Sequence, residues 1–342
     1  MKNKYFKFKI NFRNKIILIT GGTGTFGQAF VLKLLKYFEP KKLIILSRDE
    51  FKQYEMEKKF RSLGSEKLRF FLGDVRDLQR LKVAFKDVDF VIHTAALKHV
   101  ALAEYNPFEC IKTNVLGAQN IVEASIFCGV DRVIALSTDK ASNPLNIYGA
   151  SKLASDKIFI AANNYSGKDG TIFSICRYGN VVNSRGSVIP LFKKLYEKQS
   201  KTIPITDKRM TRFWININQG VEFVISCLGN MSGGEIFIPK LPSMKVTEVA
   251  KIIAPNVPFQ IIGMRPGEKL HETMISKDDA RYTIELKDRY IILPPKLHFK
   301  KKAIFKKNVV NFDLKDNFKY SSDSNEVWLN ENQLLNLLNN NI

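Results

Sequence analysis

A tyrosine and a lysine stand four positions apart, at Tyr148 and Lys152, shortly after the run Ser137-Thr138-Asp139-Lys140. Residues i and i+4 share one face of a helix, so the ammonium of Lys152 can lower the pKa of the Tyr148 phenol and bind a nicotinamide ribose. Such a pair is frequent by chance, but this one follows a Thr-Asp pair and a glycine loop, in the order that the chemistry requires. The spacing therefore indicates a nicotinamide-dependent active site.

The glycine loop lies between a short apolar run at 16–20 and a helical pattern at 28–37. Backbone that turns tightly beside a pyrophosphate needs glycine, and the N-terminus of the next helix offers free N–H groups and a partial positive charge. A generic turn is the alternative, but the strand before the loop and the helix after it favour a dinucleotide site. The predicted cofactor contacts here are Gly21, Thr23, Gly24, Thr25, Phe26 and Gly27.

The end of the second apolar run bears on the choice between NAD and NADP. Where an acidic residue would bind the ribose of NAD, the chain reads Ser47-Arg48-Asp49, with Lys52 close behind. The planar guanidinium of Arg48 can pair with a 2′-phosphate and Lys52 adds a second cation, whereas Asp49 keeps NAD open. We expect NADP as the cofactor.

Further candidates follow the third and fourth apolar runs, at the sheet edge where ligands of such folds collect. Asp74 fits an adenine contact, with a helix N-cap as the alternative. Lys98 and His99 are candidates for a sugar pocket, although His99 equally fits a structural histidine, and His93 is assigned to the core. The cofactor contacts predicted at this edge are Asp74, Val75, Ala95 and Ala96.

Short runs rich in Ile, Val and Leu alternate with longer amphipathic stretches over residues 15–136. Such runs are typical of parallel strands buried on both faces. We expect an α/β fold: a doubly wound parallel sheet of the Rossmann type with a smaller, irregular α/β lobe. The predicted divisions are an NADP-binding domain with the catalytic residues at 14–177, a UDP-sugar-binding lobe interleaved with returning strands at 178–295, and a C-terminal tail and helix at 296–342.

The composition narrows the classes of partner. A net charge of +21 fits nucleic acid, an anionic membrane surface or anionic small substrates, but the lysines are spread along the chain and no nucleic-acid-binding motif accompanies them. No apolar stretch is long enough for a membrane span. The four cysteines are scattered without metal-binding spacing, so we expect no metal site and reduced thiols in a cytoplasm.

The motifs together resemble one family. GGTGTFG, SRDEFKQYEM, GDVRD, TAALKHVALAEYNPFECIKTN, STDKASNPLNIYGASK, RYGNV, SRGSVIP, MTRFW and RPGEKLHE are similar to the inverting UDP-N-acetylglucosamine 4,6-dehydratases that open pseudaminic acid biosynthesis. These enzymes belong to the extended short-chain dehydrogenases. The likeness runs from about residue 14 to residue 335, and only the basic leader and the segment around 300–311 stand apart. It implies a homo-oligomer acting on a UDP-sugar.

The resemblance implies roles for the catalytic residues. A 4,6-dehydratase oxidises carbon 4, removes the carbon-5 proton, expels water from carbon 6 and returns the hydride to carbon 6. Tyr148 would take the hydroxyl proton at carbon 4, with Thr138 bonded to the same oxygen. Lys140 would be the carbon-5 base if burial and neighbouring cations lower its pKa, and Asp139 the acid that assists the departing water. A lysine that only binds the diphosphate is the alternative for Lys140.

The same resemblance implies which residues bind the nucleotide part of the substrate. Arginine grips a diphosphate with two hydrogen bonds, and a carboxylate such as Glu268 can accept from a ribose hydroxyl. Taken singly, these residues are as readily explained by surface ion pairs. The predicted substrate contacts are Lys98, His99, Asn180, Arg185, Arg212, Arg265 and Glu268.

Other functions stay open at this stage. A nucleotide-sugar 4-epimerase uses the same loop and the same Tyr-x-x-x-Lys, but it needs no base at carbon 5. A retaining 4,6-dehydratase has glutamate where this chain has Lys140. A dinucleotide-binding regulator or RNA-binding protein that kept the fold without the reaction is supported mainly by the positive charge.

Overall fold

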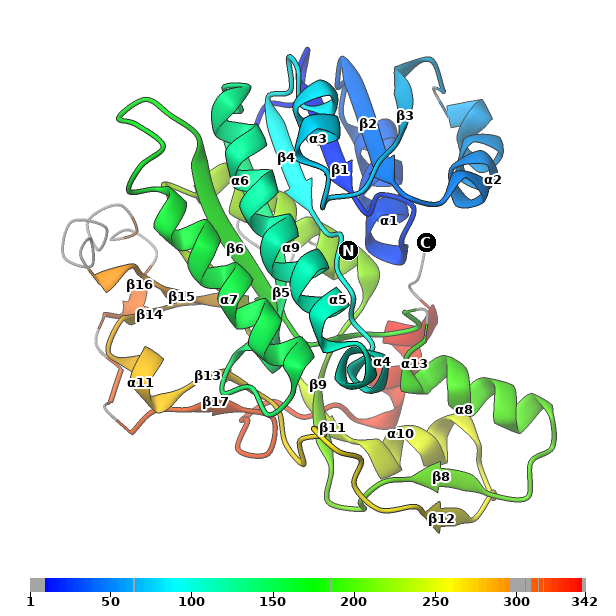
Figure 1. Ribbon diagram of the computed structural model, residues 1–342. Coiled ribbons are helices and arrows are strands. Elements are labelled where there is room, and N and C mark those ends of the chain that lie inside the picture. Colours follow the sequence, from blue (N-terminus) through cyan, green and yellow to red (C-terminus); the bar gives the residue numbers. More distant parts are fainter. Residues whose placement is uncertain are drawn as a thin grey trace.

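A ten-stranded sheet runs through the centre of the molecule (Figure 1). The computed structural model describes residues 10–339 except 64, 185, 296–304, 306–308, 313 and 316. The sheet order is β16-β14-β15-β10-β6-β5-β4-β1-β2-β3. In chain order its strands are β1 (Ile16–Thr20), β2 (Lys42–Ser47), β3 (Leu68–Leu72), β4 (Phe90–His93), β5 (Arg132–Thr138), β6 (Ile172–Tyr178), β10 (Ile236–Pro239), β14 (Thr283–Leu286), β15 (Arg289–Ile292) and β16 (Val309–Asn311).

The strands from β3 to β10 are parallel, and β15, β14 and β16 extend the sheet antiparallel at one edge. The chain moves outward from β1 to β3 and then returns to place β4 on the other side of β1. Ligands of such sheets bind at this reversal of strand order, outside the carboxyl ends of the strands. The predicted doubly wound parallel sheet is confirmed.

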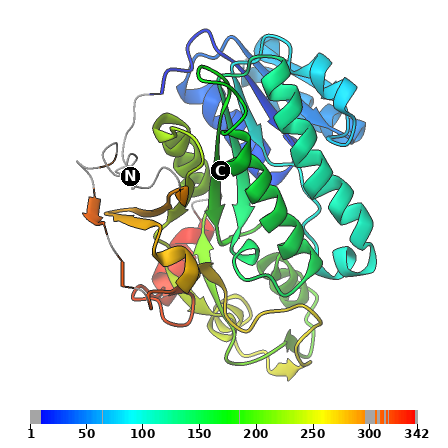
Figure 2. The same ribbon diagram turned by 60° about the vertical axis from the view of Figure 1, so that its left-hand side comes forward.

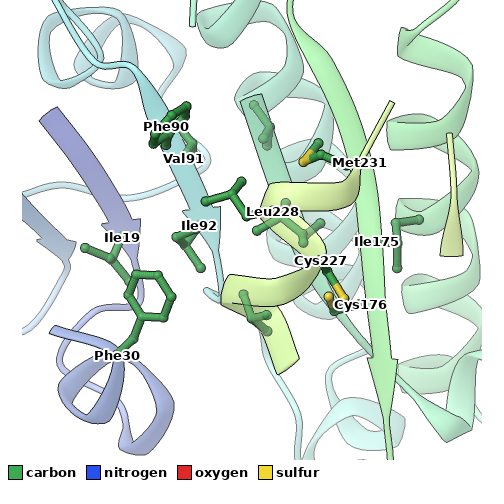
Figure 3. Packing of buried hydrophobic residues seen from close by; sticks show 14 of the residues in the cluster. Ile19, Phe30, Phe90, Val91, Ile92, Ile175, Cys176, Cys227, Leu228 and Met231 are labelled. Carbon is green, nitrogen blue, oxygen red and sulfur yellow. The ribbon is translucent and has the colours of Figure 1, made fainter. Parts of the chain in front are cut away.

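Two layers of helices cover the sheet (Figures 1 and 2). One face carries α3 (Leu78–Ala84), α5 (Pro107–Ile111), α6 (Gly117–Phe127) and α7 (Ile147–Ala162), and α1 (Thr25–Tyr37) packs against α9 (Ile217–Asn230) on the other. Strand β1 is buried along its whole length, which explains its unbroken apolar sequence. In Figure 3, Cys227 and Leu228 of α9 lie against the strands beside Cys176 of β6.

The remaining elements gather below the carboxyl ends of the strands (Figure 1). Some of these elements share a small hydrophobic core, made of Phe192, Ile203, Ile205, Met210, Val246, Ala250 and Ala254. Their bounds are α8 (Val188–Glu197), β8 (Ile203–Ile205), β9 (Thr211–Ile215), β11 (Ser243–Lys245), α10 (Val246–Ile253) and β12 (Phe259–Ile261). The short elements α2 (Glu50–Phe60), α4 (Val100–Tyr105), β7 (Asn180–Val181), β13 (Thr273–Ile275), α11 (Lys277–Ala280), β17 (Tyr320–Ser321) and α13 (Glu331–Asn339) complete the described chain.

Several smaller expectations can be compared with these elements. His93 is buried in β4 and its Nδ1 lies 2.8 Å from the Thr20 hydroxyl, so its assignment to the core is confirmed. Burial lowers the pKa of His93 to about 3. Cys110, Cys128, Cys176 and Cys227 are all free, and no group of metal-ligating side chains occurs among the described residues. None of the described helices is both long and apolar enough to span a bilayer.

The glycine loop sets a packing limit that can be tested. A Cβ on Gly27 would lie 2.4 Å from the Gly22 carbonyl oxygen, so Gly27→Ala should push α1 away from the loop. We expect a loss of about 1–3 kcal/mol in the free energy of unfolding, together with weaker cofactor retention. Denaturant unfolding measures the first quantity.

Gly220→Ala is the matched control for this substitution. Gly220 lies inside α9 with no heavy atom within 4 Å of the added Cβ, so the variant should be neutral or gain up to about 1 kcal/mol. Equal stabilities for the two variants would contradict the packing argument.

Candidate active site

The glycine loop forms a cradle at the carboxyl end of β1. Gly21 has φ +65°, and a Cβ there would lie 2.9 Å from the Ala95 backbone nitrogen, so only glycine fits. Gly24 precedes α1 and makes no side-chain cap bond, and the first turn of α1 holds no acidic residue. The exposed N–H groups of Thr25 and Phe26 therefore stay available to an anion. Such a site could hold a dinucleotide pyrophosphate, and Thr23 and Gly27 of the same loop are buried.

Beside this cradle, the residues after β2 and β3 form a chain of ion pairs. Arg48 lies at the end of β2 with its side chain 52% exposed, and its guanidinium is 3.5 Å from Asp74. Asp74 accepts from Arg76 at 2.7 Å and does not cap a helix, because Asp77 caps α3. The N-cap alternative for Asp74 is therefore wrong.

Asp49 caps α2 and pairs with Lys52. Its carboxylate is therefore already bound by the backbone N–H and the ammonium of Lys52. The Ser47 hydroxyl accepts from buried Gln53 at 3.0 Å, which ties the end of β2 to α2. These contacts leave the guanidinium of Arg48 as the more exposed cation at this edge.

Asn114 is a structural residue that the sequence did not single out. It lies in a π-helical turn (Lys112–Leu116) between α5 and α6, and its amide bonds to both the N–H and the carbonyl of Leu97 at 2.9 and 3.0 Å. The same amide donates to the Ser151 hydroxyl of α7 at 3.0 Å. Asn114 thereby fixes the segment that carries Ala95 and Ala96 against the helix of the reactive tyrosine. Buried Val75 packs at the start of α6, where a Cβ on Gly117 would meet it at 2.9 Å.

Tyr148 and Lys152 share the buried face of α7, as the spacing predicted. Asn146 caps this helix and accepts from the Gly149 N–H at 2.7 Å, which fixes the first turn. The Lys152 ammonium donates to the Leu136 carbonyl at 2.8 Å, at the carboxyl end of β5. Burial lowers the pKa of Lys152.

Burial raises the pKa of Tyr148 to about 12, against the opposing effects of Lys140 and of a hydrogen bond with Thr138. The leading cation that acts on the phenol is thus Lys140, where the sequence predicted Lys152. The Thr138 hydroxyl also donates to Asp139 at 2.9 Å, so it lies between the phenol and the carboxylate.

The Lys140 ammonium lies between two buried carboxylates. It is 3.1 Å from Asp139 and 3.1 Å from Glu272, whose side chains are 1% and 2% exposed. Burial lowers the pKa of Lys140, but Asp139 and Glu272 outweigh it and raise the pKa above its ordinary value. The expectation that this pKa falls toward neutrality is therefore wrong, because the carboxylate of Asp139, followed by that of Glu272, stabilises the ammonium.

The pKa values of the two carboxylates are shifted in opposite directions. Burial raises the pKa of Asp139, even though the adjacent ammonium opposes the shift. For Glu272, Lys140, Arg212 and Lys269 outweigh burial, and the pKa is lowered. One oxygen of each carboxylate is buried without a hydrogen-bond partner among the described residues. Two carboxylates with different proton affinities therefore share one ammonium.

The predicted nucleotide contacts lie around this cluster. Arg212 of β9 donates to the carbonyls of residues 211, 270 and 269 at 2.7, 3.0 and 2.9 Å, and its Nε is 3.6 Å from Glu272. This geometry favours a positioning role for Arg212 over the predicted direct contact with a diphosphate. The Arg265 N–H donates to Glu268 at 3.3 Å in the exposed loop before Lys269.

Other predicted contacts lie on the segments that follow β4 and begin β7. Gly186 lies against the ring of His99, since a Cβ on Gly186 would be 2.6 Å from it, so the loop after β7 meets the segment after β4. His99 precedes α4 and is exposed, as is Lys98, and half-buried Asn180 begins β7. Arg185 and most of the 300–307 segment lie outside the described residues.

Comparisons with known proteins agree with this geometry. A family described as "Polysaccharide biosynthesis protein" matches residues 17–294. The chain belongs to this family. Among its relatives, the Campylobacter jejuni (strain 81-176) protein named UDP-N-acetylglucosamine 4,6-dehydratase (inverting) is 56% identical over 96% of this chain and 98% of its own. A Rickettsia bellii UDP-glucose 4-epimerase is 41% identical over 82% of this chain and 83% of its own.

Solved structures of similar fold include a close match and a more distant one. The X-ray structure of Pen from Bacillus thuringiensis has a TM-score of 0.87 and 34% identity, covering 97% of this chain and all of that one. A dTDP-glucose 4,6-dehydratase from Streptomyces venezuelae, solved with NAD bound, has a TM-score of 0.67 and 25% identity, covering 75% and 86% of the two chains. The proteins similar to this chain thus include dehydratases and an epimerase.

The geometry of α7 predicts the effect of removing either member of the Tyr-Lys pair. Tyr148→Phe deletes the oxygen that faces Thr138 and Lys140, and Lys152→Ala deletes the ammonium beside β5. We expect each to lower turnover by about 10²–10⁴-fold, because general acid–base groups contribute on that scale. Steady-state assay of nucleotide-sugar turnover measures the loss, and near-normal rates in either variant would contradict the assignment.

Proposed function

We propose that the protein is an inverting UDP-N-acetylglucosamine 4,6-dehydratase that forms UDP-2-acetamido-2,6-dideoxy-β-L-arabino-hex-4-ulose. The observation that carries this proposal is the buried Asp139–Lys140 couple, 3.1 Å apart, beside the Tyr148 phenol. Oxidation and reduction at carbon 4 alone need only the tyrosine and the lysine of α7. An acid and a base placed next to them supply what the elimination of water requires.

A nicotinamide dinucleotide bound at the glycine cradle supplies the hydride acceptor for carbon 4 and the hydride donor for carbon 6. Tyr148 accepts the proton of the carbon-4 hydroxyl, and Thr138 holds the same oxygen. Burial of the phenol opposes its ionisation, so the positive charge of Lys140 assists this step. Lys152 orients the nicotinamide ribose from the next turn of α7.

The elimination uses one proton shared between Asp139 and Lys140. Transfer of a proton from the ammonium to the adjacent carboxylate leaves a neutral amine and a carboxylic acid. The amine removes the carbon-5 proton, and the acid protonates the carbon-6 hydroxyl, which departs as water. The pair ends as ammonium and carboxylate again. Hydride then returns to carbon 6, and a proton delivered to carbon 5 on the opposite face completes the inversion, balanced by the proton that Tyr148 took at carbon 4 and now gives up.

We infer NADP as the cofactor from Arg48, which reaches out at the end of β2 and is only loosely paired with Asp74 at 3.5 Å. A 2′-phosphate supplies the second anion that such a planar guanidinium can bind. Asp49 is engaged as the cap of α2, which weakens the case for NAD.

We expect Arg48→Ala to reduce the preference for NADP over NAD by about 10–100-fold, the scale of one charge-assisted pair. Chromatography of the cofactor released from purified protein, after loading with both dinucleotides, measures the ratio. Arg13→Ala is the control, since Arg13 pairs with Glu39 on the surface, with its side chain 73% exposed. An unchanged ratio in Arg48→Ala would assign the 2′-position to another residue.

The proposal also covers the domain division, the compartment, the oligomeric state and the pathway. We propose that residues 14–177 bind the cofactor and carry the reaction, that 178–295 hold the UDP moiety, and that 296–342 form a tail. The free cysteines support a reducing cytoplasm. A homo-oligomer and an entry point into pseudaminic acid biosynthesis rest on the resemblance alone.

Incubation with UDP-N-acetylglucosamine in heavy water, followed by proton NMR, tests the proposed reaction. We expect a 4-keto-6-deoxy product with deuterium at carbon 5 and inverted configuration there. Formation of UDP-N-acetylgalactosamine would instead identify a 4-epimerase, the activity named for the Rickettsia relative. Retained configuration at carbon 5 would identify a retaining dehydratase.

A further inference from the structure

Glu272 is the second carboxylate on the Lys140 ammonium, and it comes from a distant part of the chain. It lies just before β13, and its side chain is 2% exposed. One oxygen is 3.1 Å from Lys140 and 3.6 Å from Arg212, and the other is buried without a hydrogen-bond partner among the described residues. A buried carboxylate keeps its charge only where cations and hydrogen bonds offset the loss of hydration.

The position of Glu272 is fixed by its backbone. The Ser322 N–H donates to the Glu272 carbonyl at 2.8 Å, and the Glu272 N–H donates to the Ser322 hydroxyl at 2.9 Å. On the other side, Arg212 binds the carbonyls of residues 269 and 270, and the Lys269 ammonium donates to the Ser142 carbonyl at 2.6 Å. The carboxylate is therefore held at the ammonium from three separate segments of the chain.

We infer that Glu272 is a positioning residue for the elimination step: it aims the Lys140 side chain at the substrate and sets by its charge how readily Lys140 gives up its proton. The inference rests on the proposed function, because the carbon-5 step is the one that needs the neutral amine of Lys140. Glu272 raises the proton affinity of the amine, so it also strengthens Lys140 as a base once the proton has moved to Asp139.

The charges facing Lys140 define the expected pH dependence. Asp139, Glu272 and Tyr148 favour the ammonium, whereas Arg212 opposes it, and Lys269 is a further cation in the cluster. Removal of the Glu272 charge lowers the pKa of Lys140. The limb of the pH–rate profile that reports loss of the Lys140 proton should therefore move to lower pH, by about one unit or more.

Glu272→Gln, which keeps the shape and removes the charge, is the decisive variant, and Glu272→Asp keeps the charge but shortens the reach. We expect Glu272→Gln to slow deuterium incorporation at carbon 5 about 100-fold, with the shifted pH limb. A quenched reaction should then contain 4-keto sugar that still carries its carbon-6 hydroxyl, detected by mass spectrometry. Glu272→Asp should keep the pH limb of the native protein but lose turnover, because the carboxylate no longer reaches Lys140.

Glu285→Gln is the matched control, because Glu285 pairs with Lys240 at 2.6 Å on β14, away from the cluster, and its loss should leave the reaction unchanged. Native carbon-5 exchange and an unshifted pH limb in a folded Glu272→Gln would overturn the inference. If that variant does not fold, native turnover in Glu272→Asp overturns it equally. Failure of the unmodified protein to dehydrate the sugar would instead overturn the proposed function.

Discussion

The ammonium of Lys140 between Asp139 and Glu272 is the interaction on which the rest of the site depends. Each of these charges would be costly to bury alone, and together with Arg212 they offset one another. Several elements hold these charges together and so offset the free-energy cost of burying them: helix α7, strand β9 and the segment around β17. A site of this kind tolerates little displacement, because a partner moved away leaves an uncompensated charge in the interior.

Two chemistries meet at this cluster. The tyrosine and lysine of α7 suit hydride transfer at a carbinol, a reaction shared by many proteins with a doubly wound sheet. In the proposed reaction, the acid–base couple at the end of β5 adds carbon–oxygen cleavage. The proposal thus assigns elimination to two adjacent positions, Asp139 and Lys140.

The sequence predicted the parts that depend on local pattern. Unbroken apolar runs revealed the parallel strands, and the four-residue spacing revealed that Tyr148 and Lys152 share a face. It did not assign a role to Glu272, the last residue of the RPGEKLHE motif, because 132 positions separate it from Lys140 and no local pattern shows that the two side chains meet. The predicted direction of the Lys140 pKa was wrong because two carboxylates, Asp139 first and Glu272 second, favour the ammonium. Asn114 was missed for a similar reason. In the sequence it resembles any polar residue on the surface of an amphipathic helix, and only the π-helical turn shows that its side chain is buried.

The bonds between Ser322 and Glu272 have a consequence for biosynthesis of the protein. The residues that cradle a dinucleotide leave the ribosome first, and domains generally fold in the order of synthesis. The segment that clamps the second carboxylate is synthesised later, after residue 320. A growing chain can thus form the glycine cradle before Ser322 is available to hold Glu272 in place.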